Sequence, residues 1–224
     1  MLKKLTISII AFVLTLSFTS VAFAESRASG EINVINHDYS EQFMSDWCWA
    51  ATGLNLFIGS TGEYDNMSEN KKKEVLYQQV KEYADSTGMN LKEDKYDKYE
   101  RYNIGAGLRD TCMIVNNLLY ENRYRDVEYN FASKARSFRW IEDDIKNGYP
   151  LGILLDCTGS TADSDHIVMI NGTDTIFDTS EDYEIRIFNS DADRNIWINY
   201  EDAKNGNSKD LKYRTYVFTA EADY

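Results

Sequence analysis

The 224-residue sequence is acidic, with 37 Asp and Glu residues against 24 Lys and Arg residues and a formal net charge of −13. Because such a chain repels phosphate backbones and anionic lipid heads, we expect neither nucleic acid nor a membrane as its partner. A hydrophobic content of 43% with sixteen tyrosines excludes a disordered chain, and a single proline excludes a proline-rich linker.

The first 24 residues have the pattern of a secretory signal peptide. Lys3 and Lys4 precede a short apolar run, and small residues follow it up to an Ala-Phe-Ala sequence that ends at Ala24. This order is typical of leaders that are removed on export, whereas a transmembrane anchor needs a longer apolar run of about 20 residues. We therefore expect cleavage after Ala24, a single domain over residues 25–224, and a secreted, extracellular protein.

Helical patterns dominate the first half of the remaining chain. The segment Trp47–Gly59 is apolar on most sides, as a buried helix would be, with Ser45 or Asp46 as its N-cap and Gly59 as its end. The polar stretch Asn90–Asn103 is predicted to be a solvated loop or an exposed helix, with a lid over a cleft as the alternative. Three further helices, each with one apolar face, are predicted at Ser68–Ser86, Gly107–Tyr120 and Ser137–Lys146.

Strand patterns dominate from Pro150 onward, although one earlier strand is predicted around Val127–Phe131. Short runs rich in Ile, Val, Tyr and Phe predict strands at Leu151–Asp156, His166–Asn171, Glu184–Asn189, Asn195–Tyr200 and Lys212–Thr219. A helical part at about residues 42–148 followed by a β part at about 149–224 predicts an α+β fold, with a cleft where the two parts meet.

Three cysteines follow the leader, at positions 48, 112 and 157. An odd number in an exported protein leaves at least one thiol outside a disulfide. Either Cys112 pairs with Cys157 and Cys48 stays reduced, or all three are reduced, and sequence spacing does not choose between these states.

No bound metal or other cofactor is expected. The sequence has no C-x-x-C spacing and only two histidines, which disfavours a structural zinc site. The segment Asn189–Asn195 alternates amide and acidic side chains as a calcium loop does. However, Arg194 occupies the position of the turn glycine and Tyr200 that of the bidentate glutamate, so a polar turn between strands is the better interpretation.

Cys48 has the position of a nucleophile. It lies in the first turn of a predicted helix, where unpaired N–H groups and the helix dipole lower the pKa of a thiol. Histidine is the usual base for such a group. His37 lies in a polar lead-in, whereas His166 opens an apolar strand after a long loop, with Asp165 beside it. We therefore predict that Cys48 and His166 form a catalytic pair; the alternatives are a buried structural cysteine and a structural histidine.

The residues around Cys48 resemble those of the papain-like cysteine peptidases. Gln42, five intervening residues and then Cys48-Trp49-Ala50 match the family signature, and the W-C-W-A-A sequence at 47–51 is similar to the compact bacterial and effector branch. The resemblance continues in the same order through 141–154, 166–172 and 185–191, and it spans most of the chain after the leader.

This resemblance implies a papain-like fold and peptide-bond hydrolysis through a thioacyl-enzyme. Cys48 is then the nucleophile, His166 the base and Gln42 an oxyanion donor, with a thiolate–imidazolium pair at rest. A third residue must orient His166. We favour Asn189, because strand alternation gives it the apolar face of Ile185 and Ile187, over Asp191, which lies in a predicted turn. The long inhibitory propeptide of the family has no counterpart before Gln42.

The sequence therefore predicts a secreted cysteine peptidase that acts on protein or peptide substrates. Two other functions stay open. One is the same Cys–His chemistry on another substrate, as in a peptidoglycan amidase, an acyl transferase or a deamidase. The other is a binding module whose site does not turn over.

We predict that the exported protein begins at Glu25, because small residues precede that position as a signal peptidase requires. N-terminal sequencing of material collected from the culture medium tests this. A secreted form that retains Lys3 and Lys4 would contradict it.

Overall fold

A computed structural model describes residues 31–93, 95–132, 136–156, 166–175, 183–205 and 214–223. Contacts within the chain group the residues from Glu31 onward into one unit. The expected signal peptide, Asp165 and Cys157 lie outside the described residues, and so does the alternative pairing of Cys157 with Cys112. No helix in the described ranges is long and apolar enough to cross a bilayer.

The helices of the described residues all lie between strands along the chain. Their bounds are α2 (Cys48–Thr61), α3 (Glu69–Thr87), α4 (Lys98–Arg101), α5 (Leu108–Glu121), α6 (Phe138–Lys146) and α7 (Tyr200–Asn205). The stretch Asn90–Asn103 is largely exposed and contains α4, but it ends on two buried residues, Tyr102 and Asn103.

The predicted ends of α2 are wrong. The N-cap is Trp47 and not Ser45 or Asp46, and the helix continues past Gly59 to Gly62, which adopts a left-handed conformation with φ of 71°. Gly59 is instead a contact residue, because a Cβ atom there would lie 2.7 Å from Cγ of Pro150. Its glycine therefore reflects close packing against the chain before the next strand.

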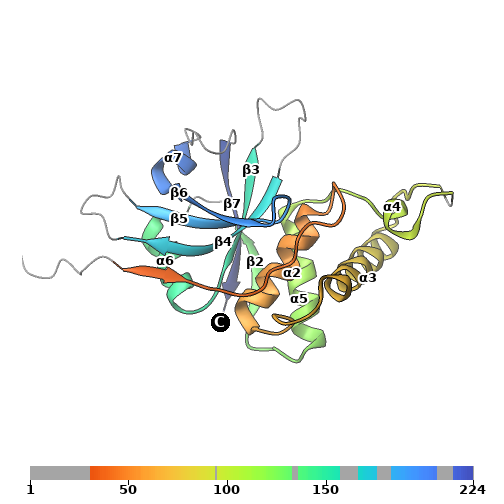
Figure 1. Cartoon of the computed structure of the whole chain (residues 1–224), viewed down its shortest axis with the longest axis horizontal. Coiled ribbons are helices and arrows are strands. Elements are labelled where there is room, and N and C mark those ends of the chain that lie inside the picture. The colour runs from red at the N-terminus through yellow and green to blue at the C-terminus, as the bar shows by residue number, and fades with distance from the viewer. Residues whose placement is uncertain are drawn as a thin grey trace, which may run out of the picture. The chain divides into compact units, whose positions relative to one another are not determined.

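One antiparallel sheet contains all the described strands. They are β1 (Ile32–Val34), β2 (Glu128–Ala132), β3 (Leu151–Asp156), β4 (His166–Asp174), β5 (Glu184–Asn189), β6 (Arg194–Asn199) and β7 (Arg214–Asp223). Their order is β2-β7-β3-β4-β5-β6, with β1 paired to β4 (Figure 1). The α+β class is thus confirmed. The strand predicted around Val127–Phe131 is present as β2, but the helical and β parts are less cleanly separated than predicted, because β1 also precedes residue 149 and α7 follows it.

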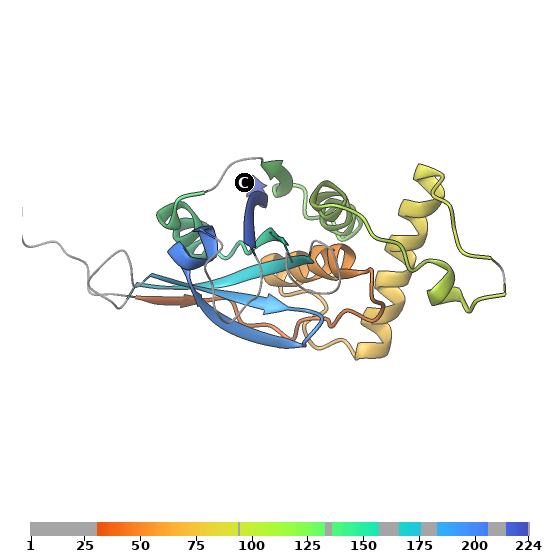
Figure 2. The ribbon, with the colours of Figure 1, turned by 90° about the horizontal axis from the view of Figure 1, so that it is seen from above.

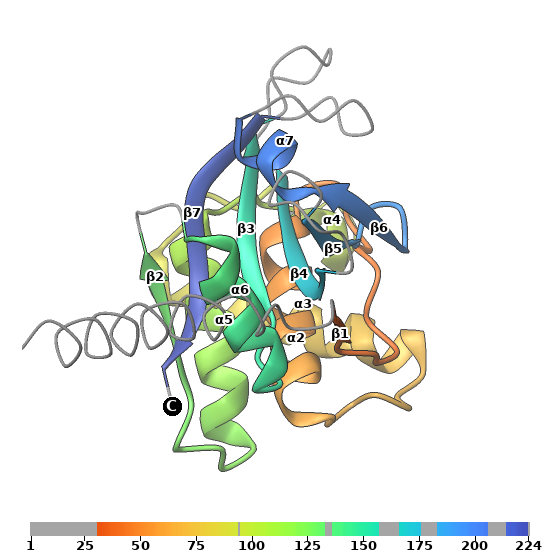
Figure 3. The same cartoon turned by 90° about the vertical axis from the view of Figure 1, so that its left-hand side faces the viewer.

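Helices cover both faces of this sheet. Along β4, Ile167 and Met169 belong to the core that contains α2, α3 and α5, whereas Val168 and Ile170 belong to the core beneath α6. This alternation is the period of two that a strand buried on both faces requires. Figure 3 shows α6 and α2 on opposite sides of β3 and β4, and Figure 2 shows α2 between the strands and α3.

Gly53 sets the distance between α2 and α5. A Cβ atom at this position would lie 2.8 Å from Cβ of Ile114 and 3.1 Å from the carbonyl oxygen of Thr111. The hydroxyl of Thr111 in turn donates to the carbonyl of Trp49 across the same contact, over 3.1 Å. The backbone of α2 at Gly53 therefore packs directly against α5, and no room is left for a side chain between the two helices.

We predict that Gly53→Ala lowers the free energy of unfolding by up to about 2 kcal/mol. Overpacking of this contact by the added methyl group costs about 1–3 kcal/mol, and the gain in helix propensity offsets about 1 kcal/mol of that cost. Urea unfolding gives the free energy. Gly105→Ala is the control, since a Cβ there meets nothing within 4 Å among the described residues. Equal stability of Gly53→Ala and wild type would show that the helices can separate freely.

Candidate active site

Cys48 is the first residue of α2, and its half-buried side chain lies against β4. The backbone of Ile167 hydrogen-bonds its sulfur. One turn further along α2, the hydroxyl of Thr52 donates to the carbonyl of Ile167 over 3.0 Å. The pairing of β4 with β5 begins only at Met169, so Ile167 has no partner in the β5 ladder. Its backbone groups bind Cys48 and Thr52 of α2 instead. The start of the helix is thereby fixed beside the start of β4.

His166 opens β4 and contacts the last residue of β5. Its Nε2 lies 2.8 Å from Oδ1 of Asn189. Because Met169 faces Phe188 across the two strands, continuing the register by one residue sets Asn189 opposite Val168. His166 is then the diagonal neighbour of Asn189 on the same face, a separation that polar side chains can bridge.

The hydrogen bonds of Asn189 define the tautomer of His166. The backbone N–H of Asp191 donates to the same oxygen, Oδ1, over 3.1 Å. A backbone N–H can only donate, so Oδ1 is the acceptor and the amide orientation follows. His166 therefore carries its proton on Nε2, which leaves Nδ1 as the basic nitrogen. Asp191 contributes its backbone N–H to this arrangement. The side chain that contacts the imidazole is that of Asn189, which strand alternation favoured.

The Cys48 thiol differs from the sequence-based expectation. Burial raises its pKa above the ordinary value, while hydrogen bonds from the backbone of Ile167 and Trp49 lower it by less. The negative charges of Asp46 and Asp191 raise the pKa further. The helix-start position does supply donors, but desolvation of the thiolate outweighs them. This balance favours a neutral thiol, in contrast to the thiolate expected at rest.

Gln42 lies on the segment that leads into α2. Its backbone N–H donates to the carbonyl of Ser190 over 2.8 Å, so the segment is bound to the turn that follows Asn189. Its side-chain Nε2 donates to the carbonyl of Ser45 over 2.6 Å. One amide N–H is thus used to hold the side chain, and among the described residues the amide oxygen is buried without a hydrogen-bond partner.

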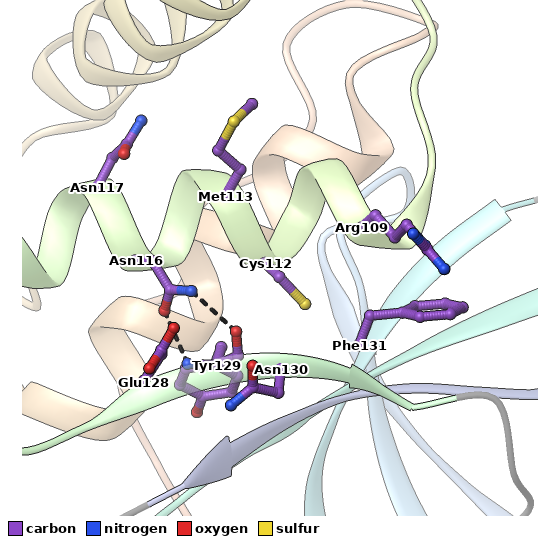
Figure 4. Close-up of a pocket in the computed structure, with 9 residues that line it drawn as sticks. All are labelled: Arg109, Cys112, Met113, Asn116, Asn117, Glu128, Tyr129, Asn130 and Phe131. Carbon is purple, nitrogen blue, oxygen red and sulfur yellow. Dashed lines mark hydrogen bonds between the residues drawn. The ribbon is translucent and has the colours of Figure 1, made fainter.

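The other histidine and the other described cysteine lie elsewhere. His37 pairs with Asp65, with 3.3 Å between Nδ1 and Oδ2. Cys112 is buried on α5 and lies at a shallow groove between α5 and β2 (Figure 4). In that groove Asn116 binds the backbone N–H and C=O of Tyr129, over 2.7 and 2.8 Å.

The candidate calcium pattern is used for hydrogen bonds between side chains. Asn189 binds His166, and the amide oxygen of Asn195 accepts from Asn171 and from Arg186. Among the residues that the structure describes, no group of three or more His, Cys, Asp or Glu side chains is arranged to hold a metal ion.

Thr52 is a residue of the site that the sequence-based prediction missed. It lies four residues after Cys48, so helical spacing puts the two side chains on one face and could have singled it out. Its partner, Ile167, follows His166 directly. The contact therefore ties the helix of the candidate nucleophile to the strand of the candidate base.

No protein-family model matches this chain, and no curated protein matches it. The assignment of function therefore depends on the residues and their geometry.

We predict that alkylation of Cys48 by iodoacetamide increases with pH, with a midpoint above the pKa of an ordinary thiol, because burial disfavours the thiolate. Asp46→Asn should move the midpoint to lower pH, since it removes a nearby negative charge. Asp193→Asn is the control, because its exposed position tolerates asparagine at φ of 45°. Peptide mapping by mass spectrometry separates Cys48 from the other cysteines. A midpoint well below that of a free thiol would instead support a resting thiolate.

Proposed function

We propose that this chain is an exported cysteine peptidase with a papain-like fold, in which Cys48, His166, Asn189 and Gln42 carry the reaction. The observation that supports it best is the 2.8 Å contact between His166 and Asn189, made beside the residue whose backbone binds the Cys48 sulfur. A nucleophile, a base and a group that orients the base are the minimum for activated thiol chemistry. They come from the start of α2, the start of β4 and the end of β5.

The proposed reaction begins with a largely neutral thiol. His166 Nδ1 takes the proton of Cys48 as the sulfur attacks the scissile carbonyl carbon. The carbon–nitrogen bond then breaks, and the imidazolium returns the proton to the leaving amine. Water, deprotonated by the same nitrogen, attacks the thioester carbon. The carbon–sulfur bond then breaks, the acid is released, and the imidazolium returns the proton to the Cys48 sulfur. Asn189 accepts from Nε2–H throughout and keeps the ring facing sulfur.

Charge on the carbonyl oxygen is stabilised by Gln42 and by the backbone N–H of Cys48. Gln42 is held at both ends, by Ser190 and by Ser45, so its amide needs little reorganisation when the oxyanion forms. Loss of one such donor commonly costs about 10²–10³ in rate.

We predict that Cys48→Ala and His166→Ala each lower peptide cleavage by at least roughly 10⁴-fold, because each residue is required for the same step. The double variant should be little worse than either single one. Asn189→Ala should cost less, since the pair remains but the ring is no longer oriented. A peptide-library digest read by mass spectrometry measures all of them.

Cys112→Ala is the matched control, because that thiol lies on α5 at the groove beside β2. It should retain wild-type turnover at equal folded fraction. Cleavage that survives Cys48→Ala would contradict the proposal. If the protein instead releases soluble fragments from purified cell wall and leaves denatured proteins and peptides intact, its function is that of a peptidoglycan amidase that uses the same catalytic residues.

A further inference from the structure

The segment after α4 is bonded to the turn that precedes the candidate nucleophile. The indole N–H of Trp47 donates to the carbonyl of Tyr102 over 2.9 Å, and that of Trp49 donates to the carbonyl of Ile104 over 3.0 Å. Both tryptophan side chains are fully buried. The indole groups of Trp47 and Trp49, which flank Cys48, therefore hydrogen-bond to the backbone on either side of Asn103.

Asn103 uses both ends of its amide on this turn. Its Oδ1 accepts from the backbone N–H of Asp46 over 3.0 Å, and its Nδ2 donates to the hydroxyl of Ser45 over 3.0 Å. Asn103 is only 9% exposed, although Ser45 and Asp46 themselves are exposed. A buried amide thus holds the exposed residues Ser45 and Asp46 of this turn.

The same turn holds the oxyanion side of the site. The carbonyl of Ser45 is the acceptor for the Gln42 side chain, and Cys48 follows the turn two residues after Asp46. A shift of the turn would move the side-chain amide of Gln42 and the backbone N–H of Cys48 together. By contrast, the contacts of the sulfur with Ile167 and of His166 with Asn189 do not pass through it.

We propose that Asn103 is a positioning residue for the oxyanion donors of this site, and this inference rests on the peptidase function proposed above. Asn103 acts through Ser45 and Asp46 and touches neither the substrate nor the sulfur. Its removal weakens stabilisation of the tetrahedral intermediate while the reactivity of the thiol remains.

Three measurements on Asn103→Ala separate these effects. We expect kcat for a peptide substrate to fall roughly 10- to 100-fold, with KM nearly unchanged, because small displacements of catalytic donors have effects of this size. Affinity for a peptide aldehyde should fall in parallel, since thiol addition gives a hemithioacetal whose oxygen occupies the oxyanion position. Alkylation of Cys48 by iodoacetamide, compared at a pH at which the thiol is fully ionised, should keep its wild-type rate, because displacement of iodide at a CH₂ carbon forms no oxyanion.

Two further variants distinguish a local effect of Asn103 from a general loss of structure. Asn116→Ala removes a side chain of the same type that also binds backbone groups, but on Tyr129 in β2, and it should keep wild-type kcat at equal folded fraction. Ser45→Ala removes only an exposed hydroxyl and should give a smaller loss in the same direction. The variant with both Asn103→Ala and Ser45→Ala should be no worse than Asn103→Ala, because the two residues share one hydrogen bond.

If the wild type is active and Asn103→Ala has the wild-type kcat and aldehyde affinity, this inference is overturned, and the proposed function remains. An equal fall in kcat and in alkylation rate would also overturn it, because the residue would then act on the thiol. A wild type that neither cleaves peptides nor binds the aldehyde would refute the proposed function and this inference with it.

Discussion

The burial of α2 on nearly every side is the constraint on which the site depends. Its residues from Trp49 to Gly59 are buried between the sheet, α3 and α5. The buried polar side chains along it, Thr52 and Asn55, already bind Ile167 and Ser40. Its first turn differs, because the N–H groups there have no partners within the helix. Cys48 occupies that turn, and the strand on which α2 packs begins with His166.

Periodicity predicted much of this architecture, because burial in a layered fold leaves a direct trace in the sequence. The apolar runs gave the strands β3 and β5 with the bounds that the structure has. Alternation along β5 also assigned Asn189 to the face that contacts His166, since side-chain direction in a strand is a local property. The same reasoning put Cys48 at a helix start.

Features that depend on distant residues left no such trace. Gly59 has the sequence context of a helix end, yet its function is contact with Pro150, about 90 residues away. The thiol pKa follows from the depth at which packing buries Cys48, which no motif encodes. Asn103 gives no local signal, because its partners lie more than fifty residues earlier in the chain.

The place of β7 in the sheet has a consequence for folding kinetics. This strand comes last among the described residues, yet it lies between β2 and β3, with its neighbours already synthesised on both sides. Until β7 inserts, β2 has no strand partner and β3 presents an open edge, the kind of surface that pairs with other chains. β1 and β4 likewise join residues that are far apart in sequence. Long-range pairings of this kind form more slowly than those between consecutive strands such as β4 and β5, so the open edge of β3 is a site at which a nascent chain can aggregate.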